Sequence, residues 1–597
     1  MRFIRLALPL SMALGATACA TTQPEPLPVA PVSDADTPVS TAAYEPTFDA
    51  ARLDAHVKRL SDDSFEGRGP ATAGETKTVK YLIDQLTAAG VEPGGEVIDG
   101  RRQWTQRVPL LKSDIVGDPV VTLHRGAAGT RLAQGTEVAI RAPMNGQTQV
   151  RLNKVPMLFA GYGVTAPERG WDDFKDVDVR GKVIVVLVND PDFEGGEGDF
   201  GGKAMTYYGR WTYKYEEAAR RGAAGVIIVH ETAPASYGWP TVQNSNTNTM
   251  FDIVRADPAK AHAPVNGWIQ QDKAAAMVAA AGLNFDTLKA AARRKDFRPV
   301  DLKTSMSVTL NAKTEVITSY NVAGRVTGSA YPNETVIYTA HHDHIGVGQP
   351  DANGDRIFNG AIDNATGTAH VIEQARAFAA GPKPQRSVLF LFVGAEEKGL
   401  LGSEYYASNP LYPLSTTAGV LNTDSMGVYG RARNFSMSGS ARFGLLDMMV
   451  EEARRRGRSF TPDANPGAGL FFRSDHFPFA KGGVPAISFR SGNDLVEGGT
   501  ARGEAIGADY TTKRYHQPDD EWQPGWDYTG LIDDAGLLHA VGRNLADSRD
   551  WPNWSQDSEF RAARDRSAGE RGETAPAPLP APAAPAPEAS PIPGERG

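Results

Sequence analysis

Histidine and acidic residues recur in five short segments of the chain, each beside small residues. Two His, two Asp and two Glu in them have side chains that suit divalent cations: His341, Asp363, Glu396, Glu397, Asp424 and His516. The segments are "TAHHDHIG" (339–346), "NGAIDNATG" (359–367), "VGAEEKGLLGS" (393–403), "NTDSMG" (422–427) and "YHQPDDE" (515–521). Nitrogen and oxygen ligands, one shared carboxylate and a spare carboxylate to act as base are what a two-metal hydrolase needs.

Predicted strands precede most of these segments. The run "RSVLFLFVGAEE" (386–397) is continuously apolar before its two glutamates, which is typical of a central strand buried on both faces. Strands are also predicted over 334–346 and 419–427, and a helix over 366–380. Ligands bind beyond the carboxyl ends of strands in sheets of this kind, so we expect the acidic residues to meet at one edge.

The whole chain has the composition of a soluble globular protein. Its 597 residues are too many for one compact core, so two or three domains are expected. Strands and helices alternate, which predicts an α/β fold with a mainly parallel mixed sheet and helices on both faces. The net charge of −9 and the lack of a basic stripe argue against a nucleic-acid partner.

The order His-x-Asp, Asp-Asn, Glu-Glu, Asp, His resembles the bimetallic zinc aminopeptidase family. Within it, the chain is similar to the branch of aminopeptidase Y and the glutamate carboxypeptidases, and the resemblance covers nearly all of 48–547. It implies a zinc-exopeptidase fold with an inserted, smaller α/β protease-associated domain. The strand, helix, strand order over 155–230 is consistent with such a module.

The predicted organisation has six parts. They are a lipoprotein-type signal (1–19), a disordered tether (20–47), the first part of the peptidase domain (48–119), the inserted protease-associated domain (120–310), the second part with the metal site (311–555) and a Pro/Ala-rich disordered tail (556–597).

The N-terminus has the pattern of a targeting segment. Arg2 and Arg5 precede an apolar run that ends in small residues before Cys19, the only cysteine of the chain. This pattern predicts lipidation of Cys19 and a periplasm-facing lipoprotein of the bacterial cell envelope, with the lipid as the only membrane contact. The alternative is an ordinary secretory signal and a soluble secreted or periplasmic protein.

The resemblance assigns roles to the site residues. His341 would bind one metal, Asp343 would hydrogen-bond its ring, and His342 and His344 would point elsewhere. Asp363 would bridge both ions, although its segment could also be only an Asx turn that caps the following helix. By the same resemblance, the peptide bond after Asp343 would be cis.

The remaining roles follow the same comparison. Glu397 and His516 would complete the second metal, Asp424 the first, and Glu396 would be the general base. Tyr515 and Arg473 are expected near the substrate. Asp475 and His476, in "RSDHFPFAKGGVPA" (473–486), are expected to support the site rather than bind metal.

The implied activity is that of an aminopeptidase acting on peptides with two Zn²⁺ per chain, although Co²⁺ or Mn²⁺ could take the same ligands. One alternative is a carboxypeptidase or dipeptidase on the same metals, with Arg473 or Arg490 holding the substrate carboxylate. Another is a non-catalytic scaffold relative, which typically lacks ligands that are present here. A one-metal cyclase would leave part of the ligand set idle. The sequence leaves the oligomeric state open.

Overall fold

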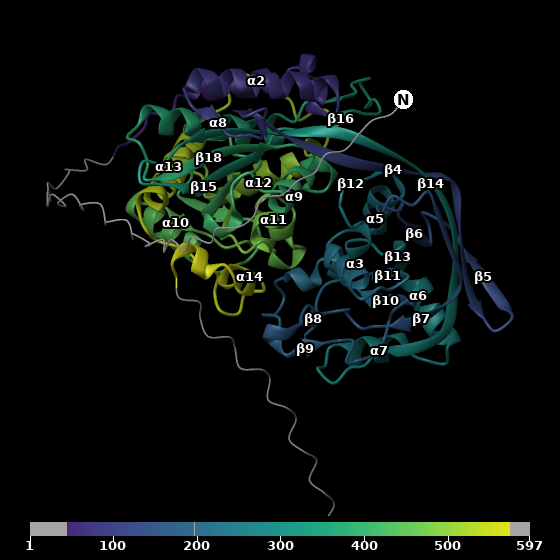
Figure 1. Ribbon diagram of the computed structural model, residues 1–597. Helices are drawn as coiled ribbons and strands as arrows, with labels where there is room; N and C mark the ends of the chain where they lie inside the picture. The colour runs from purple at the N-terminus through teal and green to yellow at the C-terminus, as the bar shows by residue number, and fades with distance from the viewer. Residues whose placement is uncertain (1–43, 196–197, 574–597) are drawn as a thin grey trace, which may run out of the picture. The chain divides into compact units, whose positions relative to one another are not determined.

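A computed structural model describes residues 44–195 and 198–573 of the chain (Figure 1). The predicted signal with Cys19, most of the tether and the Pro/Ala-rich end of the tail lie outside the described residues. The described residues from 45 onward are grouped in one compact unit. In the described part of the chain, no helix combines the length and the apolar character that crossing a membrane requires.

The described residues form a main sheet of 16 strands and three small sheets of two strands each. At the centre of the main sheet β15 (Tyr331–His341) lies parallel to both β18 (Arg386–Val393) and β19 (Thr417–Thr423), and β22 (Ala486–Ser491) continues the parallel order. Antiparallel β14 (Val300–Val326) and β20 (Asn434–Met437) flank these four strands. The predicted α/β class with a mainly parallel mixed sheet is therefore confirmed.

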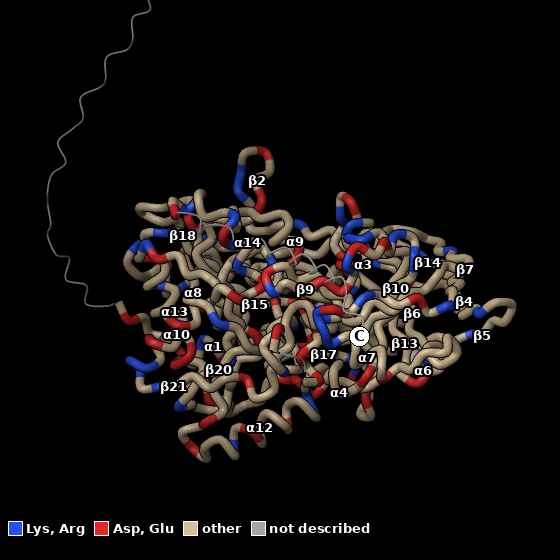
Figure 2. Tube along the Cα trace, turned by 90° about the horizontal axis from the view of Figure 1, so that it is seen from below, with Lys and Arg blue, Asp and Glu red and all other residues tan. Residues whose placement is uncertain are grey.

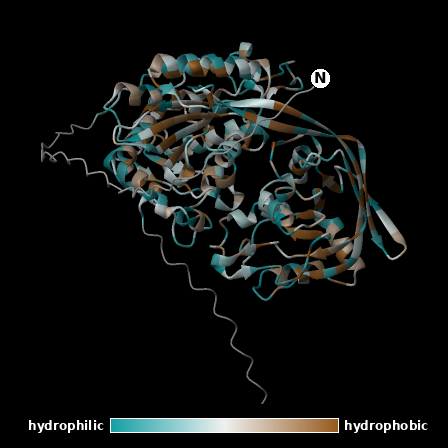
Figure 3. Cartoon of the chain, in the orientation of Figure 1, coloured by the Kyte–Doolittle hydropathy of each residue, from teal (hydrophilic) through white to brown (hydrophobic). Residues whose placement is uncertain are grey.

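Strand β18 is buried along its whole length, as its sequence predicted. Its side chains alternate between two apolar clusters: Val388 and Phe390 belong to one, Leu389 and Leu391 to the other. The strands carry much of the hydrophobic colour in Figure 3. The first cluster includes residues of α1 (Ala50–Leu60), α2 (Ala73–Ala89), α8 (Gly367–Ala380), α10 (Gly444–Arg455) and α13 (Thr529–Asp547). The second includes residues of α9 (Leu401–Ser408) and α11 (His476–Lys481).

Residues 138–270 build a second set of parallel strands. They are β7 (Gln149–Phe159), β10 (Val183–Leu187), β11 (Gly225–His230) and β13 (Val265–Gln270), with β6 (Val138–Ile140) antiparallel at the edge. Helices α3 (Trp211–Arg220), α6 (Gln271–Ala280) and α7 (Phe285–Ala292) accompany them.

Two long strands connect the two sets. β4 (Thr105–Arg125) pairs with β14 antiparallel, and β14 also pairs with β7 and β18. The predicted domain boundaries at 120 and 310 fall inside β4 and β14, which run across them without interruption. The division into a peptidase domain and an inserted domain therefore stays a prediction.

The prediction of disorder from residue 556 is wrong for residues 556–573. This stretch contains the short helices α14 (Arg561–Asp565) and η10 (Ala568–Arg571). Phe560 is buried in an apolar cluster, and the buried Arg564 donates to the carbonyl of Thr417 at 2.8 Å. The segment is too polar to show an apolar period, but a few large side chains are enough to anchor it.

Candidate metal centre

The candidate ligands follow the carboxyl ends of neighbouring parallel strands. β15 ends at His341, β19 ends one residue before Asp424, and β18 ends three residues before Glu396. Asp363 lies in the turn that leads into α8. Because the carboxyl ends of parallel strands meet at one edge, His341 and Asp424, 83 positions apart, reach the same place.

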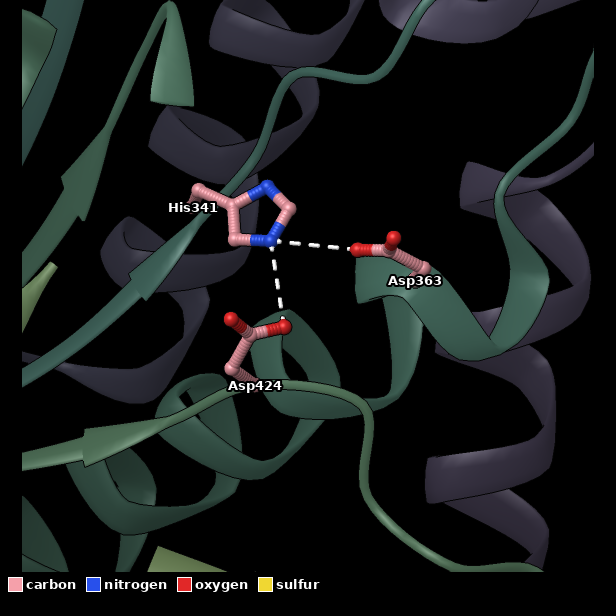
Figure 4. Close-up of side chains that lie close together, drawn as sticks. All are labelled: His341, Asp363 and Asp424. Carbon is pink, nitrogen blue, oxygen red and sulfur yellow. Dashed lines mark hydrogen bonds and ion pairs between the residues drawn. The ribbon is translucent and has the colours of Figure 1, made fainter. Parts of the chain in front are cut away.

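A first group of side chains gathers around His341. Its ring Nε2 lies 3.2 Å from Asp363 Oδ1 and 3.3 Å from Asp424 Oδ1. Figure 4 shows the ring directed at both carboxylates. Each of the three residues comes from a different segment, so this group exists only in the folded chain.

A second group uses the other oxygen of Asp363. His516 Nε2 lies 3.2 Å from Asp363 Oδ2 and 3.2 Å from Glu397 Oε2. Asp363 thus presents one carboxylate oxygen to each group, which is the arrangement expected of a carboxylate between two cations.

His344 departs from the prediction that it points elsewhere. It is buried, its Nδ1 lies 2.7 Å from Glu397 Oε1, and with Asp363 and Glu397 it forms a further cluster whose atoms lie within 4.8 Å. Since His516 faces Glu397 Oε2, His344 approaches the opposite oxygen of the same carboxylate. The prediction failed because β15 ends at His341, and the alternation of sides along a strand does not extend past its end.

Asp343 also acts differently from the prediction. Its Oδ1 is 3.9 Å from His341 Nδ1, which instead lies 3.2 Å from the Asp343 backbone carbonyl. The carboxylate accepts the backbone N–H groups of Glu396 at 3.0 Å and Glu397 at 3.3 Å. Asp343 therefore holds the turn that carries the glutamate pair.

The predicted cis peptide bond is wrong as well. Among the described residues the cis bond joins Asp363 to Asn364, and the bond after Asp343 is trans.

Two supporting residues were missed in the sequence. Asp520 accepts the backbone N–H groups of Ile362 and Asp363, both at 3.0 Å, and so holds the turn that carries the shared carboxylate. Ser474 donates to Asp424 Oδ2 at 2.7 Å. Asp520 stands in "YHQPDDE" and Ser474 in "RSDHFPFAKGGVPA", so proximity to motif residues was the available signal.

Arg473 and Tyr515 occupy different surroundings. Tyr515 is 45% exposed and stacks on His516 with ring centroids 3.9 Å apart, so it borders the second group. Arg473 donates to Ser236 Oγ at 3.1 Å and to the carbonyl of Ala468 at 3.0 Å, outside both groups. The structure brings Tyr515 to the site and directs Arg473 toward other partners.

The site concentrates negative charge in a buried place. Burial raises the pKa of Glu396 well above its usual range, and neighbouring carboxylates add to this rise although His341 opposes it. Burial would lower the pKa of His341, but Glu396 and Asp424 outweigh it and raise that pKa well above its ordinary value. Buried carboxylates at this density call for positive charge between them.

The residues present fit divalent cations. His344 Nε2 is buried without a hydrogen-bond partner among the described residues, and on the other side of the ring Nδ1 faces Glu397 Oε1 at 2.7 Å. The donors are imidazole nitrogens and carboxylate oxygens without a thiol, a set that suits zinc in a catalytic rather than a closed structural site.

Comparison with known proteins agrees with this site. The sequence model of Peptidase family M28 matches residues 321–537, which hold all the candidate ligands. The predicted resemblance to the zinc aminopeptidases is confirmed as a likeness over this segment: residues 321–537 are similar to peptidase family M28.

The similarity to individual relatives covers only part of each relative's sequence. Leupeptin-inactivating enzyme 1 of Streptomyces exfoliatus is 30% identical over 190 residues, covering 30% of this chain and 37% of its own. The probable lipoprotein aminopeptidase LpqL of Mycobacterium tuberculosis is 26% identical over 266 residues, covering 40% of this chain and 47% of its own. The chain thus spans less than half the length of both relatives.

Among solved structures, the aminopeptidase from Aneurinibacillus sp. strain AM-1 aligns with 84% of this chain and 95% of its own. The identity is 19% and the TM-score 0.45.

Proposed function

We propose that the chain is a metal-dependent exopeptidase that removes N-terminal residues from peptides. One observation carries this proposal: the two oxygens of Asp363 face two separate ligand groups, with Glu396 beside them. The names of the M28 relatives, a leupeptin-inactivating enzyme and a probable aminopeptidase, favour the same class of reaction.

In this proposal the two groups bind two Zn²⁺ ions per chain. His341, Asp363 and Asp424 hold the first ion, and Asp363, Glu397 and His516 hold the second. Three protein ligands for each ion leave positions for water and substrate, as catalytic zinc requires. Co²⁺ or Mn²⁺ could occupy the same ligands.

Glu396 is the general base of the proposed reaction. When bound, the two cations would supply Lewis acidity at the scissile carbonyl and lower the pKa of adjacent water. The carboxylate of Glu396 accepts the proton of the attacking water and delivers it to the leaving amine. Asp343 keeps this carboxylate in place through its hydrogen bond to the backbone N–H of Glu396, 3.0 Å long.

The test is hydrolysis of a panel of aminoacyl-p-nitroanilides with matched N-acetylated compounds, before and after treatment with a chelator. Cleavage that needs a free amine, stops on chelation and returns with zinc supports the proposal. Cleavage of the acetylated compounds, or of C-terminal residues alone, would contradict the aminopeptidase assignment.

We also propose that Cys19 carries a lipid and holds the enzyme at the bacterial cell envelope, facing the periplasm. The support is the basic and apolar segment before the single cysteine, together with a relative named as a probable lipoprotein. Membrane fractionation of the full chain and the Cys19→Ala variant tests this. Release of the variant with retention of the wild type is expected, and equal distribution would contradict it.

A further inference from the structure

Arg68 is a charged side chain buried close to the candidate metal centre. It ends the short helix η1 (Asp63–Arg68) and is 1% exposed. Its guanidinium donates four hydrogen bonds, and every acceptor is a backbone carbonyl. A buried arginine that donates only to carbonyls can fix the relative positions of several backbone segments, because its planar guanidinium carries five N–H donors.

Three of the four acceptors belong to the segments that carry His341 and Asp363, two of the three residues in the first ligand group. Arg68 Nε donates to the carbonyl of His342 at 3.0 Å, one residue after His341. Its other nitrogens donate to the carbonyls of Asn359 at 2.5 Å and Gly360 at 2.8 Å, just before the turn with Asp363. The two ligand-bearing segments are therefore joined through one side chain.

Two further hydrogen bonds connect Arg68 to neighbouring segments. Arg68 donates to the carbonyl of Leu60 at the end of α1, at 2.7 Å. In the other direction, the backbone carbonyl of Arg68 accepts the N–H of His344 at 3.4 Å. The segment 342–344 is thus held by both the side chain and the backbone of one residue.

The backbone before Arg68 is closely packed. Gly67 has φ 62°, and a Cβ there would lie 2.5 Å from the carbonyl oxygens of Gly346 and Phe358. These two residues belong to the hairpin of β16 (Gly346–Val347) and β17 (Ile357–Phe358), which connects the two ligand-bearing segments. Close packing against this hairpin therefore fixes the backbone position from which the Arg68 side chain extends.

The guanidinium stays charged at neutral pH. Burial lowers the pKa of Arg68 to about 10, while Asp520, Asp343, Asp363 and Glu397 oppose this fall. Lysine would keep the charge but carries its donors on one nitrogen, which cannot serve carbonyls in several segments at the same time. The substitution Arg68→Lys therefore separates the effect of the positive charge from the effect of the hydrogen bonds to the backbone.

We propose that Arg68 is a positioning residue of the metal centre, which sets zinc affinity by holding the segments of His341 and Asp363 in register. This inference rests on the proposed zinc site. It requires that zinc affinity depend on the arginine fork and not on the positive charge alone.

The test is the zinc dissociation constant, measured by competition with a chromophoric chelator for the wild type, Arg68→Lys and Arg564→Lys. Arg564 is a matched control, since it is also 1% exposed and donates to the carbonyl of Thr417, at the opposite end of β19 from Asp424. Arg68→Lys is expected to weaken zinc binding by about 10- to 100-fold, the range seen when a ligand loses its supporting contact. Arg564→Lys is expected to leave it unchanged.

Wild-type affinity in Arg68→Lys, or an equal loss in Arg564→Lys, would overturn the inference. If Arg68→Lys does not fold, Arg68→Gln serves, because its single amide nitrogen cannot replace the three guanidinium nitrogens that donate to four carbonyls. Unchanged zinc affinity in Arg68→Gln would also overturn it. A wild-type chain that binds no zinc would instead refute the proposed function, and this inference with it.

Discussion

Single residues of the centre depend on partners that bind no metal themselves. Asp520 is the clearest case, because both of its carboxylate oxygens accept backbone N–H groups of the turn that carries Asp363. Ser474 plays a similar part for Asp424 through its hydroxyl. Such supporting contacts orient the ligands and so contribute to metal affinity.

Asp520→Asn is predicted to weaken zinc binding. An asparagine side chain offers one acceptor oxygen, so one of the two N–H groups at 3.0 Å loses its partner. A loss of about tenfold in affinity is expected from chelator competition. Asp173→Asn is the matched control, since buried Asp173 accepts two N–H groups far along the chain from the ligands, from the backbone of Val164 and the indole of Trp171. Equal zinc binding by both variants would contradict the role of Asp520.

The ligand set could be predicted because each residue type stands beside a recognisable strand end. The roles of Asp343 and His344 could not, since they lie past the end of β15, where backbone turns decide the direction of a side chain. The role of Arg68 could not be predicted from the sequence for a different reason. Its acceptor His342 is 274 positions away, and hydrogen bonds to backbone carbonyls leave no residue pattern in the partner segment.

At the scale of elements, helices α1 and α8 are joined by an ionic contact between Arg52 and Glu373. Glu373 of α8 accepts Arg52 Nε at 2.9 Å and Arg376 Nε at 3.1 Å, and lies 3.5 Å from His56 Nε2. Burial would raise the pKa of Glu373, but His56, Arg52 and Arg376 outweigh it and hold that pKa at about 2.

This contact predicts a pH-dependent stability. The folded pKa of about 2 lies below the ordinary value of 4.5, so the stabilisation is complete above pH 4.5 and is lost as the pH falls toward 2. At pH 7, Glu373→Gln should lower the free energy of unfolding of the metal-free protein by about 2 kcal/mol. The difference should shrink below pH 4.5 and vanish near pH 2, measured by urea unfolding with chelator present.

Exposed Glu451→Gln, which removes a surface pair with Arg454, is the control and should change little at any pH. A Glu373→Gln effect that stays constant from pH 7 to pH 3 would show that ionisation of Glu373 does not stabilise the helix pair.

At the scale of the whole molecule, the two sets of strands share β4 and β14 and also meet through aromatic side chains. Tyr207 lies 5.2 Å from Phe477, 6.1 Å from Phe472 and 6.5 Å from Phe560, measured between ring centroids. Lys481 of α11 pairs with Glu216 of α3 at 2.9 Å. Acidic and basic residues are interspersed along the described chain (Figure 2).

The continuous sheet predicts that the described residues from 45 onward unfold in one cooperative transition, which calorimetry can measure. Tyr207→Ala should lower the free energy of unfolding by about 3 kcal/mol through lost ring packing. Tyr207→Phe keeps the ring and loses only the hydroxyl bond to Glu216, so it should cost much less. Two separate transitions in the wild type would contradict the shared-sheet account.

The order of strands and helices in the peptidase half was predictable because apolar runs and helical periods are strong there. The lengths of β4 and β14 were not, because these strands contain polar residues on exposed faces and their pairing joins positions near 110 and 317. The ordered segment 556–573 was missed since it depends on anchoring by Phe560 and Arg564.

The most direct test of the account is the rate of Glu396→Gln relative to the wild type on an aminoacyl-p-nitroanilide, with the metal content of both proteins matched. A half-buried base next to the ligand Glu397 predicts a loss of about 10²- to 10⁴-fold in kcat, with about two zinc ions retained per chain. Near wild-type activity in a metal-loaded Glu396→Gln chain would contradict the assignment of Glu396 as the base.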